Sequence, residues 1–528
     1  MPVPTRPRSP SPSPQHKKLK FTPVALYGIL PLGNYLGRPS LPCSLGTLRR
    51  LPDELILYLF SLFSPSDLLS LSAVSKACFA FALHEPLWKE HYVSLSEGKL
   101  GRWQGTWRKT FLTRLGHAPD LPIWPTDGIS CRGIFSDVLY QPQLCASLPL
   151  HHYFPSKKQN IPRRPYTSLS PAEFAAHYAA PGEPVILTGA LETWAAYTHP
   201  SHKWSLSSLA NRFPSVRLQA EALSCTFAEY ERYASNCAGE DTPLYMFDSG
   251  FVESASGMGE EYKPFEVFGE DLFDLFGSER PDYRWLIAGP AHSGSTFHLD
   301  PNSTSAWNAS LKGTKAWVFF PPQCTPPGVY VSPDEGEVTG PVGVGEWVEA
   351  YLKEGWRRFG PQGREGAGLM RIGLQREGDV VYVPSGWWHL VVNLTPCIAV
   401  TQNFVSQHEL HKVLKFMRDK PGQVSGFKDP KRRDECCEGE EDESGDAYRA
   451  GLYGRFVNLL EENEPGLLRE ALAKLGPVPV GREGEGEGSK VRERKERVVQ
   501  KEKEKEQGSF RFDFELDFEL EEEEVGYQ

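Results

Sequence analysis

The second half of the chain is built from short apolar runs separated by turns. Runs rich in β-branched and aromatic residues occupy residues 315–320, 380–383, 390–394 and 398–404. Runs of this length and composition predict β-strands. Residues 384–386, with the sequence Pro-Ser-Gly, predict a turn between two of these strands. We therefore expect a mostly β domain in this part of the chain.

The parity of strand residues separates the two faces of each predicted strand, because successive side chains point in opposite directions. Lys315, Trp317 and Phe319 share one face, which combines one charge with two aromatic rings. Thr401 and Asn403 share a face of the last strand. A buried lysine without an anionic partner is costly. Lys315 is therefore a candidate for binding an anion.

The N-terminal part has a helical pattern instead. Apolar residues recur at helical spacing at Ile56, Leu59, Phe60 and Phe63. Residues 52–54, a proline followed by two acids, predict the start of this helix, with the proline in its first turn. Ser64 and Asp67 are spaced like a capping box and predict a second helix. Two further helices are predicted, at residues 77–83 and from residue 86.

An insertion rich in Gly and Pro separates two of the predicted strands. It covers residues 324–372, of which only 345–356 have helical character. Such an insertion commonly forms a lid or a substrate wall. After the last strand, residues 408–418 and 446–474 have helical character. The leucines of the latter stretch could pack on the strand domain or on another subunit.

Composition bounds the ordered part of the chain. The 528 residues are 40% hydrophobic and 12% aromatic, which is enough for a substantial core, while 45 prolines and 48 glycines indicate much loop. Order is expected over about residues 40–475. Residues 1–20 lack the apolar segment of a secretory signal, and no run reaches the length of a membrane span. From about residue 480, Gly/Glu and Lys/Arg/Glu mixtures lead into an acidic, aromatic tail, which predicts disorder.

Cysteine usage and charge add two further constraints. Ten cysteines, adjacent only at Cys436 and Cys437 and without CxxC spacing, indicate reduced thiols rather than a disulfide framework or a zinc site. Lys and Arg exceed Asp and Glu by nine over residues 1–117. Because the whole chain has a net charge of −11, the rest of the chain has a net charge of about −20. We interpret most of this N-terminal excess as solvated helix surface, because the pattern of a nucleic-acid module is missing. The basic cluster at residues 16–20 is typical of a nuclear import signal.

Three residues form a candidate metal site. His298 and Asp300 lie two positions apart, so on a strand covering residues 296–300 both side chains leave the same face. His389 follows the predicted strand 380–383 and its turn. Two imidazoles and one carboxylate are the ligand set of the facial triad, which holds Fe(II) and leaves positions open for O₂ and substrates. Ligands from well-separated strands imply a closed or nearly closed barrel.

Five ordered blocks surround these residues. They are PLYMFD (243–248), YRWLIAGPAHSGSTFHLDP (283–301), TSAWNASLKGTKAWVFFP (304–321), GDVVYVPSGWWHLVVNL (378–394) and IAVTQNFVS (398–406). Over about residues 160–410 the chain thereby resembles the Jumonji C (JmjC) family of Fe(II)- and 2-oxoglutarate-dependent oxygenases, in particular its phosphatidylserine-receptor-like branch. The resemblance implies a mostly β catalytic domain, a double-stranded β-helix or cupin-like barrel with flanking helices. It also implies that His298, Asp300 and His389 are the iron ligands.

The resemblance also implies a set of cosubstrate contacts. In that family, the positions that bind 2-oxoglutarate match Lys315, Thr401, Asn308 and Tyr245. Ser295 stands where relatives often have threonine, which keeps the hydroxyl. Because the distal carboxylate of 2-oxoglutarate needs a cation and a hydroxyl in an apolar cavity, Lys315 is the natural candidate on chemical grounds as well. Trp387 and Trp388 are interpreted as core residues.

The reaction implied by the resemblance uses Fe(II), 2-oxoglutarate and O₂ to oxidise a C–H bond of a protein substrate, with succinate and CO₂ as coproducts. Oxidation of a lysine carbon gives hydroxylysine. Oxidation of an N-methyl group gives an unstable hydroxymethyl product that releases formaldehyde. The sequence does not choose between a hydroxylase and a demethylase. The cosubstrate residues argue against a cupin that uses another metal.

Residues 51–92 resemble an F-box, the all-helical module that in its family docks on the Skp1 adaptor of a cullin ubiquitin ligase. The other interpretation is a helical module that packs on the barrel and meets no ligase. A second class of function follows, a ligase substrate receptor whose barrel binds substrate without turning it over. The complete triad with Lys315 and Thr401 favours the enzyme, because a barrel kept for binding need not retain these groups.

The predicted organisation runs from a disordered or linking N-terminus (1–45), an F-box-like domain (46–95) and a linker and packing segment (96–159) to the JmjC domain (160–410), C-terminal helices (411–475) and a charged tail (476–528). C-terminal helices support dimers in relatives, so a homodimer is a hypothesis. The acidic balance of the catalytic half favours a basic or nucleic-acid-associated protein substrate, with lysine as the first guess. The nucleus is the favoured location, and the cytoplasm is the alternative.

Overall fold

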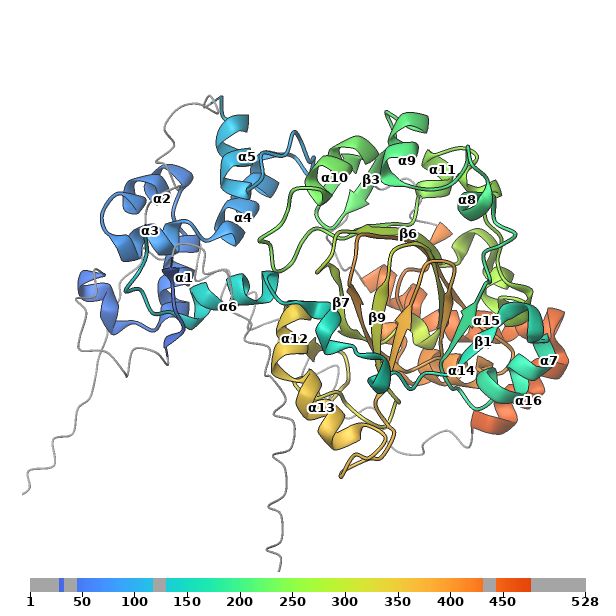
Figure 1. Ribbon diagram of the computed structural model, residues 1–528. Coiled ribbons are helices and arrows are strands. Elements are labelled where there is room, and N and C mark those ends of the chain that lie inside the picture. The colour runs from blue at the N-terminus through green and yellow to red at the C-terminus, as the bar shows by residue number, and fades with distance from the viewer. Residues whose placement is uncertain (1–27, 33–44, 117–129, 431–442, 476–528) are drawn as a thin grey trace, which may run out of the picture. The chain divides into compact units, whose positions relative to one another are not determined.

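The computed structural model describes residues 28–32, 45–116, 130–430 and 443–475 (Figure 1). The basic cluster, the Cys436 and Cys437 pair and the charged tail lie outside the described residues. The seven described cysteines are unpaired, buried thiols. Across the described ranges, no helix combines the length and the apolar character needed to cross a membrane.

Four helices form the N-terminal module: α1 (Asp53–Ser61), α2 (Pro65–Ser72), α3 (Lys76–Ala82) and α4 (Glu85–Leu95) (Figure 1). Ile56 and Phe60 of α1 are buried, as their helical spacing predicts. The Ser64 side chain accepts a hydrogen bond of 3.2 Å from the Asp67 N–H, which confirms the predicted cap of α2. Pro52 precedes the first turn of α1 instead of lying in it.

The segment predicted to link the two domains contains two further helices, α5 (Trp107–Arg114) and α6 (Asp137–Ala146). Thr106 caps α5 and Ser136 caps α6, each through a side-chain oxygen that accepts a backbone N–H. Trp103 lies with its ring centroid 4.9 Å from that of Trp107 and 4.9 Å from that of Tyr233. This segment therefore contributes buried aromatic side chains to the core.

The larger domain is built from fifteen strands. They are β1 (Arg163–Pro165), β2 (Val185–Thr188), β3 (Arg217–Ala220), β4 (Leu223–Thr226), β5 (Met246–Asp248), β6 (Arg284–Gly289), β7 (Gly294–His298), β8 (Ser305–Lys312), β9 (Lys315–Phe320), β10 (Tyr330–Val331), β11 (Val338–Thr339), β12 (Arg371–Gln375), β13 (Val380–Val383), β14 (Trp388–Asn393) and β15 (Cys397–Phe404). The runs predicted at residues 315–320 and 380–383 match β9 and β13, and the other two match β14 and β15 within two residues.

Two sheets enclose the interior of this domain (Figure 1). The nine-stranded sheet has the order β1-β2-β13-β8-β15-β6-β5-β3-β4, and the four-stranded sheet has the order β12-β9-β14-β7. From β6 to β9 and from β13 to β15, successive strands alternate between the two sheets, as in a double-stranded β-helix. Among the described strands the sheets do not pair with each other, so the structure is a two-sheet cupin fold and not a closed barrel.

The alternation predicted for β9 is confirmed by its packing. Trp317 and Phe319 lie in a buried cluster with Val381 of β13, between the sheets. The intervening residues Ala316, Val318 and Phe320 lie in a different cluster on the outer face. Lys315 has the parity of Trp317 and therefore belongs to the inner face.

Helices cover the sheets. Before β6 the chain forms α7 (Pro171–Phe174), α8 (Ala195–Thr198), α9 (Leu206–Arg212), α10 (Phe227–Ala234) and α11 (Phe251–Ser254). The insertion forms the β10–β11 hairpin and two helices, α12 (Val344–Ala350) and α13 (Leu352–Phe359), where the sequence predicted one helix. Figure 1 shows α12 beside β7. Because the ring centroid of Trp347 on α12 lies 4.8 Å from that of Phe297, the helices of the insertion support the outer face of the small sheet and do not form a lid.

Three helices follow β15: α14 (Leu410–Asp419), α15 (Glu443–Asn463) and α16 (Pro465–Leu475). The Phe456 ring of α15 lies 5.3 Å from the ring of Phe273 and 5.2 Å from the ring of Phe276, centroid to centroid. Arg455 also pairs with Glu279. The sequence left open whether this helix packs on the strand domain or on another subunit, and these contacts bury part of it within its own chain.

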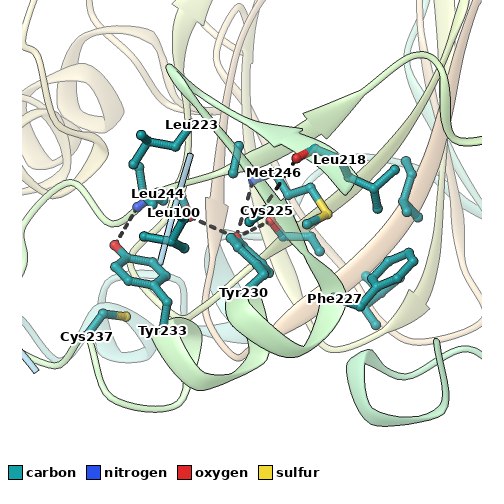
Figure 2. Packing of buried hydrophobic residues seen from close by; sticks show 14 of the residues in the cluster. Leu100, Leu218, Leu223, Cys225, Phe227, Tyr230, Tyr233, Cys237, Leu244 and Met246 are labelled. Carbon is teal, nitrogen blue, oxygen red and sulfur yellow. Dashed lines mark hydrogen bonds between the residues drawn. The ribbon is translucent and has the colours of Figure 1, made fainter. Parts of the chain in front are cut away.

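Two buried tyrosines of α10 fix the segment that carries Tyr245 (Figure 2). The Tyr230 hydroxyl lies 2.8 Å from the Leu244 carbonyl oxygen and 2.7 Å from that of Ala288 on β6, and it shares its proton between them. The Leu244 N–H donates to the Tyr233 hydroxyl at 2.7 Å. The backbone just before β5 is thereby tied to α10 and β6.

We expect Tyr230→Phe to lower the free energy of unfolding by about 1–3 kcal/mol, because it removes a donor from carbonyl groups in the core. Urea unfolding measures this change. Tyr58→Phe is the matched control, because the Tyr58 side chain is 63% exposed and its hydroxyl is open to water. Equal unfolding midpoints for the two variants would contradict the assignment.

Candidate metal centre

His298, Asp300 and His389 converge as the sequence predicts. One ligand atom of each lies within 4.8 Å of the others. His298 ends β7 and is the direct cross-strand partner of His389 on β14, and the two ring centroids are 4.1 Å apart. No other group of three such ligands occurs in the part of the chain that the structure describes. The trio therefore has the spacing of a single metal site.

Backbone carbonyls hold both imidazoles in the same tautomer. Nδ1 of His298 lies 2.7 Å from the Thr296 carbonyl oxygen, and Nδ1 of His389 lies 3.0 Å from that of Trp387. A carbonyl only accepts, so Nδ1 carries a proton in each ring, and in the neutral form of the ring Nε2 is then the atom with the free lone pair. Burial, with His298 acting in the same direction, holds the pKa of His389 well below its ordinary value. Neutral imidazoles with free Nε2 atoms are the form that binds a metal.

Asp300 lies after the strand and not on it. β7 ends at His298, whereas the sequence predicted a strand to residue 300. The Asp300 backbone stays extended, with φ −64° and ψ 143°, before a turn that begins at Pro301. Oδ2 of Asp300 is buried and has no hydrogen-bond partner among the described residues. Burial raises the pKa of Asp300, while His298 and a hydrogen bond from Asn403 lower it. A bound cation would give Oδ2 the partner it lacks.

Aromatic rings back the His389 side chain. The Trp317 ring stacks on Phe319 with 5.5 Å between centroids and faces His389 at 6.0 Å. Its indole N–H donates to Gln375 Oε1 at 2.8 Å, and the Gln375 amide donates to the Asn308 carbonyl oxygen at 2.7 Å. This side of the site is therefore apolar and held in place.

Trp387 and Trp388 are buried, in agreement with their interpretation as core residues. Trp387 lies in the cluster between the sheets and donates its indole N–H to the Gly182 carbonyl oxygen at 2.7 Å. Trp388 lies in the cluster on the outer face of the small sheet. Trp388 is therefore turned away from the metal site.

Lys315 is fully buried. Its ammonium donates to the Tyr245 hydroxyl at 3.0 Å. Among the described residues, no carboxylate oxygen lies within 4.0 Å of the ammonium. A buried cation without a counter-charge is costly. The buried ammonium of Lys315 therefore suits a ligand that brings its own carboxylate.

The remaining predicted residues lie on both sheets. Thr401 and Asn308 are cross-strand partners on the nine-stranded sheet. The Thr401 hydroxyl donates to the Trp307 carbonyl oxygen at 2.8 Å, and Oδ1 of Asn308 is a buried acceptor with no partner in the described chain. Ser295 pairs with Val391 on the four-stranded sheet. The structure thus leaves an amide oxygen of Asn308 free for a ligand or water.

Asn393 was missing from the predicted site. It is fully buried on β14, directly opposite Lys315 on β9. Its amide donates to Ser293 Oγ at 2.8 Å, and its own Oδ1 has no partner among the residues described. The alternation of side chains along β14 could have indicated Asn393, because His389, Val391 and Asn393 share the inner face of this strand.

Comparisons with known proteins agree with both parts of this architecture. The model of the cupin-like domain matches residues 224–409, and the F-box-like model matches residues 48–94. The arginine-specific demethylase JMJ22 of Arabidopsis thaliana is 36% identical over 86% of this chain and 84% of its own length. The bifunctional arginine demethylase and lysyl-hydroxylase psr-1 of Caenorhabditis briggsae is 34% identical over 51% of this chain and 67% of its own length. The human 2-oxoglutarate and iron-dependent oxygenase JMJD4 is 28% identical over 37% of this chain and 45% of its own length.

Proposed function

Because this chain belongs to the JmjC family of Fe(II)- and 2-oxoglutarate-dependent oxygenases, with an F-box-like domain before the catalytic one, we propose that His298, Asp300 and His389 hold its iron. The protein is a 2-oxoglutarate-dependent dioxygenase of the hydroxylase or demethylase type. The free Nε2 atoms and the unpartnered Oδ2 of Asp300 support this ligand assignment.

We propose that Lys315 and Tyr245 bind the distal carboxylate of 2-oxoglutarate, with Thr401, Asn308 and Ser295 as further contacts. The observation that carries this proposal is the buried ammonium of Lys315, which lacks an anionic partner in the described chain. Bound Fe(II) and 2-oxoglutarate would together activate O₂, which is the oxidant for the C–H bond. Lys315 neutralises the cosubstrate, and the rings of Trp317 and Phe319 keep water from the face of His389 that they cover.

We propose a basic side chain in a protein as the substrate, either lysine or N-methylated arginine. The relatives support this class, since their names state arginine demethylation and lysyl hydroxylation. Incubation of the iron-loaded protein with peptides of both kinds tests the proposal. Gain of one oxygen atom on lysine indicates a hydroxylase, whereas loss of a methylene with release of formaldehyde indicates a demethylase. Absence of substrate-stimulated succinate with either kind would reject this substrate class.

We also propose that the N-terminal module docks on a Skp1-type adaptor. Three apolar side chains at i, i+3 and i+7 are exposed: Leu55 and Tyr58 on α1 and Leu62 directly after it; Val74 after α2 is exposed as well. Exposed apolar side chains clustered in this way are typical of an interaction site. No observation favours the alternative, a ligase substrate receptor whose barrel binds substrate without turning it over. The three proposed metal ligands and Lys315, which such a receptor would not need, are all present.

Leu62→Asp should weaken adaptor binding at least about tenfold, because it places a charge in an apolar interface. Pull-down titration with purified Skp1 measures the effect. Val342→Asp, which changes an 84% exposed side chain in the insertion, serves as the control. The adaptor proposal fails if wild type, Leu62→Asp and Val342→Asp capture equal amounts of Skp1.

Localisation to the nucleus and formation of a homodimer remain predictions. The basic cluster at residues 16–20 supports the nucleus over the cytoplasm. The part of α15 around Phe456 already packs on its own chain, while Leu472 of α16 is left 39% exposed for a second copy. Imaging of the tagged chain tests the first prediction, and light scattering of the full chain tests the second. A purely cytoplasmic signal or a monomer would contradict them.

A further inference from the structure

We propose that Phe247 and Trp285 form an aromatic ledge that binds a cationic side chain of the protein substrate as it approaches Asp300. This inference rests on the proposed function and adds the residues that select the substrate. Phe247 lies on β5 and Trp285 on β6, and their ring centroids are 5.4 Å apart. The aromatic ledge consists of these two side chains only.

Strand register places the ledge on the catalytic face of the nine-stranded sheet. Trp285 is the cross-strand partner of Thr401, and Phe247 is the partner of Ile287 on β6. Partners in register and residues two apart on a strand share a face. Trp285, Ile287 and Tyr245 accordingly pack in one small cluster, apart from the helix-covered core. The ledge therefore lies on the same face as the predicted cosubstrate residues.

A cavity lies between Trp285 of the ledge and the residues that directly follow Asp300. It has a volume of about 210 Å³, and its walls include Tyr283, Trp285, Pro301, Asn302 and Asn403. Pro301 directly follows Asp300 in the chain, and Asn403 hydrogen-bonds the Asp300 carboxylate. Because an apolar cavity of about 150 Å³ can hold a benzene molecule, this cavity accommodates one long side chain.

The ledge is open to solvent. The Phe247 side chain is 42% exposed, and Trp285 is half-buried. Within the described ranges, no lysine or arginine lies over either ring, whereas the guanidinium of Arg280 lies 3.6 Å from the ring centroid of Tyr283 nearby. The rim of the cavity thus already holds one guanidinium on an aromatic face and leaves two further rings free.

The charges around the ledge permit a cation to approach. Arg280 pairs with Asp271, Arg284 with Glu253 and Lys428 with Asp282. These pairs leave no unbalanced positive charge at the rim. Aromatic faces attract lysine and arginine side chains, including methylated ones, through the ring quadrupole. The chemistry of the ledge therefore matches a basic residue and not an acidic one.

The test compares the iron-loaded full chain with its Trp285→Ala, Phe247→Ala and Trp285→Phe variants. The substrates are the lysine and methylarginine peptides that wild type oxidises. We expect both alanine variants to raise KM for the peptide about tenfold, with kcat and KM for 2-oxoglutarate within about twofold of wild type. Trp285→Phe should retain most of the affinity. Phe213→Ala, at the end of α9, controls for loss of a partly exposed aromatic side chain.

Binding measured without turnover separates this inference from the proposed function. Fluorescence anisotropy with a labelled methylarginine peptide and its neutral citrulline analogue should show tighter binding of the basic peptide to wild type and equal, weak binding of both to Trp285→Ala. If the protein shows this binding pattern but wild type releases no succinate, the proposed function is rejected and the ledge is supported. Normal turnover with unchanged peptide KM in both alanine variants would overturn the ledge. A fall in kcat alone would also overturn it, and loss of both binding and turnover in wild type would overturn both.

Discussion

Replacing His298 with alanine abolishes substrate-stimulated succinate release, with a loss of about three orders of magnitude or more. The structure gives the reason. His298 is one of the three proposed ligands in the described part of the chain, and its Nε2 is the atom that the Thr296 carbonyl leaves free to bind. Two remaining ligands hold Fe(II) weakly, so the variant should also lose iron. Metal analysis after gel filtration measures this loss directly.

His411→Ala is the matched control, because His411 lies on α14 outside the trio. It should keep both iron and succinate release. The thermal midpoint of His298→Ala without metal should lie close to that of metal-free wild type, since His298 is not fully buried. Retention of more than about a tenth of wild-type turnover by His298→Ala would remove this site from the reaction.

The convergence of the three proposed metal ligands could be predicted from the sequence because the chemistry and spacing of His298 and Asp300 are local. His298 and Asp300 are two residues apart, and extended backbone brings such side chains to one side whether or not the strand continues. The strand itself stops at His298. The predicted strand was therefore too long at its end, while the convergence of the ligands was correct.

Ser295 shows where strict alternation along a strand fails to predict the face of a side chain. Strict alternation places Ser295 on the face opposite His298. Between the pairs His389–His298 and Val391–Ser295, however, β7 has two residues, Thr296 and Phe297, where β14 has one, Leu390. This bulge resets the alternation and turns Ser295 toward the face of Val391. Bulges depend on the partner strand, so one sequence read alone does not reveal them.

Packing between segments that lie far apart in the chain could not be predicted from the sequence either. The sequence predicts one helix over residues 345–356 where the structure has α12 and α13, because apolar spacing alone does not show that Trp347 packs against Phe297 of β7. Asn393 and Gln375, the last residues of β14 and β12, were not predicted because their roles depend on hydrogen-bond partners outside their own strands. Their partners, Ser293 and Trp317, lie far away in the chain.

Replacing Lys315 with methionine should separate cosubstrate binding from stability. The substitution removes the buried ammonium and keeps an apolar chain of similar length. We expect KM for 2-oxoglutarate to rise about a hundredfold or more, because the distal carboxylate loses its charge partner. Without cosubstrate, the variant should be as stable as wild type or more stable by about 1–3 kcal/mol, because a buried, unpaired charge is costly in the free protein.

Thermal unfolding with and without 2-oxoglutarate measures both effects. The cosubstrate should raise the midpoint of wild type, since a ligand that binds only the folded state stabilises it, and should leave that of Lys315→Met unchanged. Lys312→Met is the control, because Lys312 is an exposed lysine three residues earlier in the chain. A purely structural lysine would behave in the opposite way, with lower stability and a normal KM for 2-oxoglutarate. Because the two roles predict changes of opposite sign in the free protein, a single pair of melting curves decides whether Lys315 is kept for its ligand.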